Sequence, residues 1–247
     1  MQKSHLFTTL FIALSIALIA FAKPTNNTAA SAAINMIAAD SNIAAAPDKA
    51  ELSASLYESL NLSQKGLSKE ALDAAIKGYE KLKSNGAVDN SKYLTVIDFS
   101  QSSRKKRFYL IDVENAELVM NTFVSHGKNT GVDMATKFSN TINSEQSSLG
   151  FYITNATYTG KHGLSLRLDG QEEGFNSNAM ARGIVMHGAD YVNPGRVNSA
   201  FMGRSQGCPA LSNAEYAKAI NYIKGGSVMF IYYPAQDYLQ QSPVLNS

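Results

Sequence analysis

Short runs of β-branched and aromatic residues, separated by turn-type segments, constrain the fold of this chain more than any other feature. Such runs predict strands over 93–99, 108–113, 117–124, 151–153, 183–186 and 227–233. The repeated strand–helix alternation of a doubly wound parallel sheet is missing from this pattern. We therefore expect a mainly β domain over residues 91–236, built from mixed or antiparallel sheets, followed by a C-terminal tail over residues 237–247.

Two helices are expected before the strands, as a helical appendage over residues 48–90. In the first, Leu52, Leu56 and Leu60 repeat at the four-residue spacing of a helix face. Ser68 is a suitable cap for the second, and Asn85 and Gly86 end it. Its predicted apolar face consists of Leu72, Ala75, Ile76, Tyr79 and Leu82.

One further helix is expected between the last two strands. Ser212 is its predicted cap, with Glu215 at the capping-box position and Gly225–Gly226 at its end. Its buried stripe consists of Tyr216, Ile220 and Ile223.

The N-terminus predicts export. A charged start, an apolar run from Leu6 to Phe21 and a small-x-small site at Ala20–Ala22 are the parts of a secretory signal peptide over residues 1–22. The alternative is an uncleaved anchor, although the run is short for a membrane span. Residues 23–47 have the Ala- and Asn-rich composition of a flexible linker. We expect an exported protein of the periplasm or cell envelope, with no stable membrane span after cleavage.

Charge and cysteine content narrow the function classes. With 22 basic and 20 acidic residues, the chain lacks the basic excess of a nucleic-acid-binding protein. Its single cysteine, Cys208, is unable to form an internal disulfide. In an exported protein such a cysteine is a buried small hydrophobe, an intermolecular link or a reactive thiol.

The surroundings of Cys208 favour the reactive thiol. His187 follows the apolar strand over 183–186, where a rigid support projects its side chain into a cleft. Cys208 lies in a glycine-containing loop just before the helix predicted to begin at Ser212. A nearby imidazole either takes the proton of a thiol or holds it as a thiolate–imidazolium pair.

These residues carry a family resemblance. His187–Gly188 followed by Ser205-x-Gly207-Cys208 resembles the signature of the L,D-transpeptidase (YkuD-like) family, and the stretch between them has the length typical of that family. The resemblance covers about residues 93–233. Further similar blocks lie at 138–140, 147–152, 158–166 and 203–205.

The resemblance implies a peptidoglycan transpeptidase that forms 3→3 cross-links. Cys208 is the implied nucleophile, His187 the base, and the carbonyl of Gly188 the group that orients the histidine. The N–H groups of Gly207 and Cys208 would then stabilise the oxyanion. The implied partners are peptidoglycan stem peptides, a tetrapeptide donor and an amine acceptor, and no cofactor is implied.

Three further residues are implied to line the substrate site. They are Ser205, through hydrogen bonding, Arg204, through carboxylate binding, and His162. The chain departs from the family at Gln206, where a histidine is common, and this departure bears on donor or acceptor preference.

Several alternatives remain open at this stage. Water as acceptor gives an L,D-carboxypeptidase, and a protein amine gives wall anchoring, with the same nucleophile. An inert Cys208 gives a wall-binding protein, and a general cysteine protease is a further option. A metal site at His187, Asp190 and Cys208 is disfavoured, because no second histidine stands at motif spacing.

Two other polar features are expected to be structural. The basic run at residues 104–107 falls in a turn between two strands and predicts a solvated hairpin tip. His126 follows a strand and is expected to be a surface or loop histidine bonded to the backbone.

Overall fold

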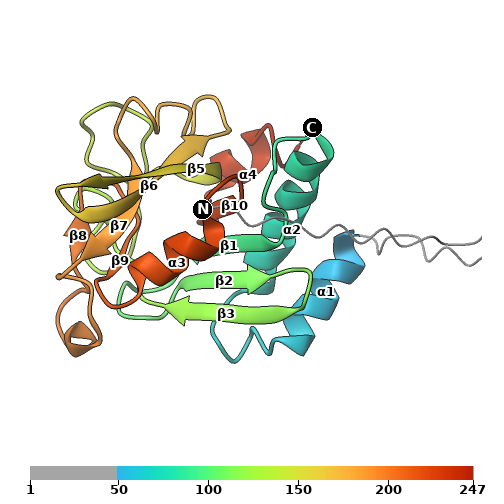
Figure 1. The fold of residues 1–247 in the computed structure, drawn as a ribbon, viewed down its shortest axis with the longest axis horizontal. Helices are drawn as coiled ribbons and strands as arrows, with labels where there is room; N and C mark the ends of the chain where they lie inside the picture. Colours follow the sequence, from blue (N-terminus) through green and yellow to red (C-terminus); the bar gives the residue numbers. More distant parts are fainter. Residues whose placement is uncertain (1–48, 247) are drawn as a thin grey trace, which may run out of the picture. The chain divides into compact units, whose positions relative to one another are not determined.

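The computed structural model describes residues 49–246, and its architecture is mainly β, as expected (Figure 1). The helices are α1 (Lys49–Ser59), α2 (Lys69–Ser84), α3 (Tyr216–Ile223), α4 (Gln236–Gln241) and the short 3-10 turn η1 (Pro194–Arg196). The strands are β1 (Tyr93–Asp98), β2 (Phe108–Asp112), β3 (Glu117–Thr122), β4 (His126–Gly127), β5 (Gly150–Gly160), β6 (Gly163–Gly170), β7 (Val185–Ala189), β8 (Arg204–Ser205), β9 (Ala210–Ser212) and β10 (Val228–Tyr232).

Eight of these strands form one mixed sheet in the order β3-β2-β1-β10-β5-β6-β7-β9. β1 pairs parallel with β10 and β7 pairs parallel with β9, while the other neighbours are antiparallel. β4 and β8 form a separate parallel pair. The expectation of mixed sheets is thus confirmed, and the parallel neighbours β1 and β10 come from distant parts of the sequence.

One apolar core joins the sheet to α2 and α3. The face of α2 predicted from the sequence is buried throughout. Gly78 lies where this helix approaches the sheet most closely, because a Cβ atom there would stand 2.1 Å from the ring of Phe151 on β5. The absence of a side chain at this position lets the helix backbone come close to the central strands.

The helix ends are partly as predicted. Ser68 caps α2, its hydroxyl accepting from the Ala71 N–H, and the helix ends at Asn85. The prediction that Ser212 caps α3 is wrong, because α3 begins at Tyr216 and Ser212 is the last residue of β9. The Ser212 hydroxyl donates instead to the Glu215 carboxylate, at 2.7 Å.

The β5–β6 hairpin is longer than expected. Only residues 151–153 were predicted as a strand, but β5 extends to Gly160 and β6 returns from Gly163. The two strands pair from Tyr152↔Gly170 to Gly160↔Gly163, with a register shift between Thr154 and Thr157. His162 therefore lies in the tight turn at the tip of this hairpin.

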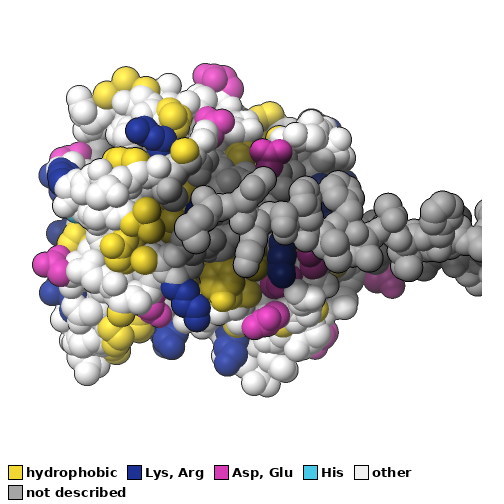
Figure 2. Space-filling model, in the orientation of Figure 1, with side chains coloured by type: hydrophobic (Ala, Val, Ile, Leu, Met, Phe, Trp, Pro, Cys, Tyr) yellow, Lys and Arg dark blue, Asp and Glu magenta, His cyan; other side chains and the backbone are white. Residues whose placement is uncertain are grey.

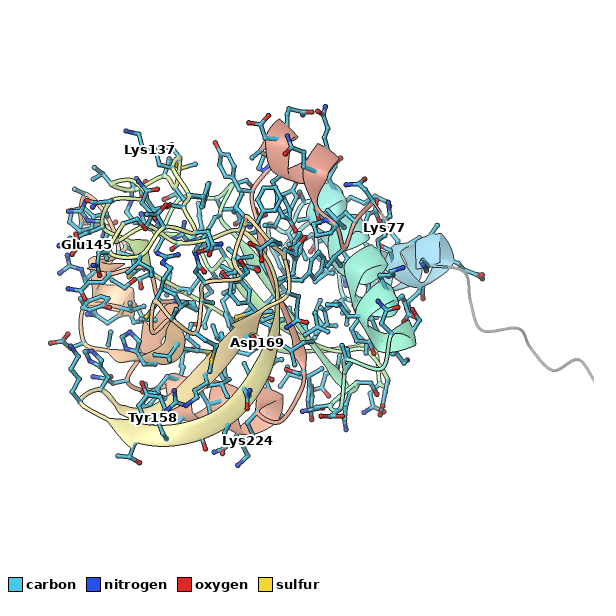
Figure 3. All side chains as sticks on the ribbon, turned by 90° about the horizontal axis from the view of Figure 1, so that it is seen from above. Lys77, Lys137, Glu145, Tyr158, Asp169 and Lys224 are labelled. Carbon is cyan, nitrogen blue, oxygen red and sulfur yellow. The ribbon has the colours of Figure 1, made fainter. Side chains whose placement is uncertain are left out.

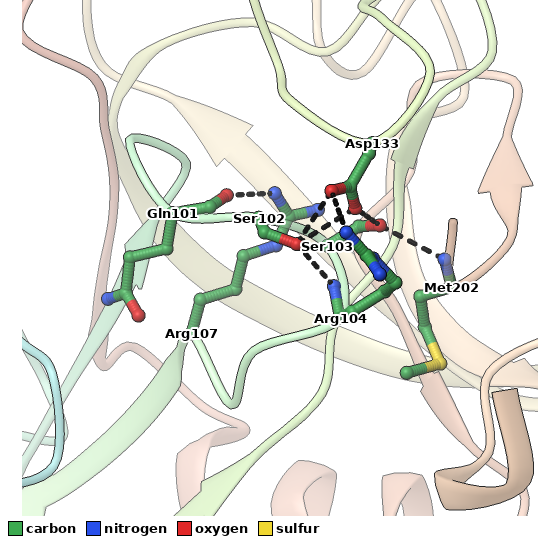
Figure 4. Close-up of polar contacts among 7 residues, drawn as sticks. All are labelled: Gln101, Ser102, Ser103, Arg104, Arg107, Asp133 and Met202. Carbon is green, nitrogen blue, oxygen red and sulfur yellow. Dashed lines mark hydrogen bonds and ion pairs between the residues drawn. The ribbon is translucent and has the colours of Figure 1, made fainter. Parts of the chain in front are cut away.

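The basic run at residues 104–107 is more than a solvated tip (Figure 4). The Arg104 guanidinium pairs with Asp133 at 3.0 Å, and the same carboxylate accepts from the hydroxyls of Ser102 and Ser103. The Ser103 hydroxyl also accepts from the Met202 N–H at 3.0 Å. Lys105 and Lys106 are exposed, as predicted. The turn thus connects two loops that are distant in sequence.

Arg107 and His126 correct the expectation of surface residues, because both are fully buried. Arg107 donates to the carbonyl oxygen of Val124 and contacts the His126 Nδ1 at 2.8 Å. Its guanidinium stacks over the ring of Phe99. His126 lies in β4, which pairs with β8, so this buried pair supports the strand that leads to Cys208.

The segment predicted as a tail contains most of α4 and is held by a buried carboxylate. Glu172 is fully buried and accepts from the hydroxyls of Tyr238 and Ser242 and from the Phe151 N–H. A buried carboxylate is stable only when such donors replace its hydration. Glu172 therefore fixes the C-terminal residues against β5.

The predicted signal peptide (1–22) and the linker (23–47) both fall before the first described residue, so both remain predictions. Within residues 49–246, no helix has the length and apolar character required to span a bilayer.

The contact of Gly78 with Phe151 yields the first testable prediction. Glycine to alanine inside a helix ordinarily stabilises a protein, by up to about 1 kcal/mol. Gly78→Ala should instead lower the free energy of unfolding by about 1–3 kcal/mol, because the new methyl group overpacks the core. Urea unfolding measures the change. Lys77→Ala, on the exposed face of α2, is the control and should be near neutral; stabilisation by Gly78→Ala would refute the close packing.

Candidate active site

His187 and Cys208 line one cavity of about 490 Å³. The cavity lies where the tip of the β5–β6 hairpin, β7 and the segment from β8 to Cys208 come together. Its other lining residues are Lys128, Tyr158, Gly160, Lys161, His162, Ser165, Gly183, Val185, Tyr191, Arg204, Ser205 and Gln206. Tyr158, on β5, is seen from above in Figure 3. Of the residues predicted for the site, Gly188 and Gly207 lie behind this lining.

The sequence predicted that His187 follows the end of its strand. In the structure, His187 instead lies within β7. It is paired with Ser165 of β6 on one side and Ala210 of β9 on the other. The next residue, Gly188, packs against α3, where an added Cβ would stand 2.6 Å from the ring of Tyr216. The backbone that carries the histidine is therefore held by two strands and a helix.

The ring orientation of His187 is fixed by its own strand. Its Nδ1 lies 2.8 Å from the carbonyl oxygen of Gly188. A carbonyl oxygen only accepts, so Nδ1 carries the proton and Nε2 is left as the basic nitrogen. This is the arrangement that a general base requires.

Cys208 lies in the short loop between β8 and β9, and the hydroxyl of Ser205 organises this loop. The hydroxyl accepts from the Gly207 N–H at 3.0 Å and donates to the Cys208 carbonyl at 2.6 Å. Gly207 has φ +124°, a conformation that favours glycine. Since its N–H is bound to Ser205, Gly207 is not poised to stabilise an oxyanion, contrary to the expectation from sequence.

A second loop supports the cysteine loop from behind. The Ser147 hydroxyl donates to the Gly207 carbonyl at 3.1 Å. Arg182 donates to the Gln146 carbonyl and to the hydroxyls of Ser144 and Ser148, which holds the loop closed. Sequence reasoning missed Arg182, although its position shortly before β7 placed it near the site.

Burial determines the charge state of the pair. Burial raises the pKa of the Cys208 thiol, against the smaller opposing effects of the Val185 N–H and the charges of Arg182 and Lys161. Burial also lowers the pKa of His187; the hydrogen bond to Gly188 opposes this, while His162 and Lys161 add to it. Both shifts disfavour the thiolate–imidazolium pair. Near neutral pH the resting site therefore holds a neutral thiol and a neutral imidazole.

His162 lies against the base. Its ring stacks on that of His187 with 4.4 Å between centroids and 24° between planes. The side chain is otherwise exposed, since it belongs to the turn of the β5–β6 hairpin. The alternation of Leu164, Leu166 and Leu168, which the strand prediction did not use, is a sequence signal for the second strand of this hairpin.

Arg204 and Ser205 lie in β8 and reach the cavity as predicted from the resemblance. Asp190, considered as a metal ligand, is exposed and is not among the residues that line the cavity. Across residues 49–246, no group of three or more His, Cys, Asp or Glu side chains is placed to hold a metal ion.

One comparison with known proteins shows the family of this chain. A family model for the L,D-transpeptidase catalytic domain matches residues 63–232, more than half of the chain. No match was found among curated proteins.

The following three are among the solved structures that match this chain. One is an L,D-transpeptidase from Mycobacterium smegmatis, with 16% identity, 57% of this chain and 59% of that chain covered, and a TM-score of 0.35. One from Mycobacterium tuberculosis H37Rv has 11% identity, 57% and 58% coverage, and a TM-score of 0.36. One from Stackebrandtia nassauensis has 11% identity, 76% and 92% coverage, and a TM-score of 0.32. The chain spans less than two thirds of the first two.

The stacked histidines yield a prediction for the titration of His187. His162→Ala should raise the pKa of His187 towards the ordinary value of about 6.5, because it admits water to the ring and removes the electrostatic effect by which His162 lowers that pKa. Histidine NMR resonances followed against pH measure the shift. The buried His126, with a pKa of about 4, is the internal control and should not move. An unchanged or lower pKa of His187 would show that His162 does not influence the base.

Proposed function

Because the chain belongs to the L,D-transpeptidase catalytic-domain family, we propose that it forms 3→3 cross-links in peptidoglycan through a thioester on Cys208. The observation that carries this proposal is the placement of Cys208 and His187 in one cavity, with the His187 Nδ1 bound to the Gly188 carbonyl. That arrangement provides a nucleophile and an oriented base in the same cavity.

In the first step, the Cys208 sulfur attacks the carbonyl carbon that joins the third residue of a donor stem peptide, a diamino acid, to the terminal D-alanine. The thiol proton passes to the His187 Nε2 as the carbon–sulfur bond forms. The same proton then passes to the leaving amine of D-alanine, the carbon–nitrogen bond breaks, and a thioester remains on Cys208.

In the second step, the side-chain amine of another stem peptide attacks the thioester. His187 accepts a proton from this amine, the new amide bond forms, and the sulfur leaves and takes the proton back. The protein begins and ends the cycle with a neutral thiol and a neutral imidazole, which is the resting state that burial favours.

The tetrahedral intermediate of each step needs hydrogen-bond donors for its oxyanion. The Cys208 N–H is the donor we assign, since the Gly207 N–H is bound to Ser205. One such donor contributes about 3 kcal/mol to the transition state. Ser205 thus acts here by holding the loop, while Arg204 and His162 are assigned to substrate binding at the cavity wall.

The identity of the acceptor distinguishes this proposal from the alternative enzymatic functions. Water in place of the amine would give an L,D-carboxypeptidase, and a protein amine would give an anchoring transferase, both through the same thioester. A wall-binding protein with an inert thiol would form no thioester at all.

We also propose that the protein acts outside the cytoplasm, in the periplasm or cell envelope. The N-terminal pattern of residues 1–22 supports this, because it has the three parts of a signal peptide. Mass spectrometry of the protein from its native envelope fraction should find a mature N-terminus after Ala22. A full-length chain recovered from the cytoplasm would contradict the proposal.

The thioester yields the main test. The mature protein, incubated with a disaccharide-tetrapeptide, should show a covalent adduct by intact mass spectrometry and should accumulate dimeric muropeptide. Cys208→Ala should abolish both while remaining folded by circular dichroism. Tripeptide without dimer would favour the carboxypeptidase. No adduct and no product with folded wild-type protein would contradict the proposal and favour an inert thiol.

A further inference from the structure

The charged side chains that line the cavity have one sign. They are Lys128, Lys161 and Arg204, and the lining contains no aspartate or glutamate. The rest of the protein is different: the chain has nearly equal numbers of basic and acidic residues, and both kinds are interspersed over the described part of the face in Figure 2. The cavity is therefore a local concentration of positive charge beside the thiol.

Arg204 is fixed in place without an acidic partner. Its Nη1 donates to the carbonyls of Lys128 and Gly131, and its guanidinium stacks on the ring of Phe201 at 4.5 Å. No carboxylate of residues 49–246 forms an ion pair with it, and its Nε and Nη2 make no hydrogen bond within those residues. A guanidinium that is fixed in place and has free N–H donors is suited to binding a carboxylate, because the carboxylate accepts hydrogen bonds from two of its N–H groups.

The two lysines differ from each other. Lys128 pairs with Glu145 at 2.6 Å, so its charge is already offset. Lys161, in the turn of the β5–β6 hairpin, forms no ion pair with any carboxylate of residues 49–246. Arg204 and Lys161 thus come from two separate elements, line the same cavity as Cys208 and lack counter-charges among the described residues.

We propose that this cavity selects donor stem peptides by charge, favouring those with a free side-chain carboxylate on the third residue over those with the amide. This inference rests on the proposed function and names its substrate class. The terminal D-alanine of the donor carries a carboxylate near the bond that breaks. A diamino acid with an acidic side-chain terminus adds another carboxylate at the end of that side chain. Arg204 and Lys161 are the unpaired cations that we assign to these two groups, and amidation of the third residue removes one of the two charges.

The chemistry of the cavity gives the direction of the preference. An amide is almost the same size as a carboxylate, so shape does not distinguish them. The amide loses the charge-assisted bond to the guanidinium and presents an –NH₂ group to cationic donors. A site that binds a charged group in this way discriminates against its neutral analogue.

Two matched donors test the proposal, a disaccharide-tetrapeptide with the free side-chain carboxyl on residue three and the same compound with the amide. The readout is the rate of Cys208 adduct formation at low donor concentration. Wild type should favour the free carboxyl by roughly five- to tenfold. The double variant Arg204→Gln/Lys161→Gln should bring the ratio near one, chiefly by slowing the reaction of the acidic donor.

Lys137→Gln is the matched control, because it removes a positive charge from an exposed lysine far from Tyr158 and the cavity (Figure 3). It should keep the wild-type ratio. Arg204→Lys retains the positive charge but lacks the paired N–H groups of the guanidinium, so it should keep part of the wild-type rate ratio.

Two results would overturn the inference while the proposed function stands: equal rates for both donors with wild type, or an undiminished ratio in the double variant. If neither donor forms an adduct with folded wild-type protein, the proposed function fails, and the inference fails with it.

Discussion

The parallel pairing of β7 with β9 is the constraint on which the site depends. It places His187 beside Ala210, only two residues after Cys208, so the base and the nucleophile line the same cavity although a long loop separates them in the sequence. Parallel neighbours need a crossover connection, and here that connection carries η1 and β8 and ends in the cysteine loop. The packing of α3 on Gly188 and the pairing of β8 with β4 then hold the two sides of the connection. A shift of register by one residue in β7 would turn His187 to the opposite face of the sheet.

The same burial that fixes these groups opposes their ionisation. The pKa of the Cys208 thiol is raised and that of His187 is lowered, so the site does not store a preformed thiolate. The proton must then move while the sulfur attacks, and geometry matters more than the resting charge. This explains why so many contacts serve orientation alone: Gly188 holds the imidazole, Ser205 holds both sides of Gly207, and Arg182 holds the loop behind them.

The elements whose pattern is local could be predicted from the sequence. The face of α2, its cap at Ser68 and the six short strands follow from periodicity and turn residues. The pairing of distant strands could not, because strand order depends on contacts that no local window contains. Ser212 shows the limit at short range: a serine three residues before a glutamate resembles a capping box, yet the β7–β9 pairing draws it into a strand. Arg107 and His126 show the same limit for polar residues, because their burial depends on partners that folding supplies from elsewhere.

At the site, the resemblance placed His187, Cys208 and Arg204 in a common centre. The hydrogen bond between Ser205 and the Gly207 N–H depends on backbone geometry alone, so the sequence did not predict it.

The charge of the cavity and the neutrality of the catalytic pair are connected. The positive charge of Lys161 favours the thiolate but makes His187 a weaker base, and these two effects oppose each other in the proton transfer. On the proposed binding mode, a substrate carboxylate beside Lys161 offsets that charge. The imidazole would then become more basic when the donor binds, while the thiol would become less acidic. The neutral pair transfers its proton during attack, so the more basic His187 compensates for the less acidic Cys208 thiol. The free-energy cost of desolvating the substrate carboxylate is met when the donor binds and not in the chemical step. On this binding mode the cavity keeps its thiol protonated when empty, and an anionic donor makes its base stronger.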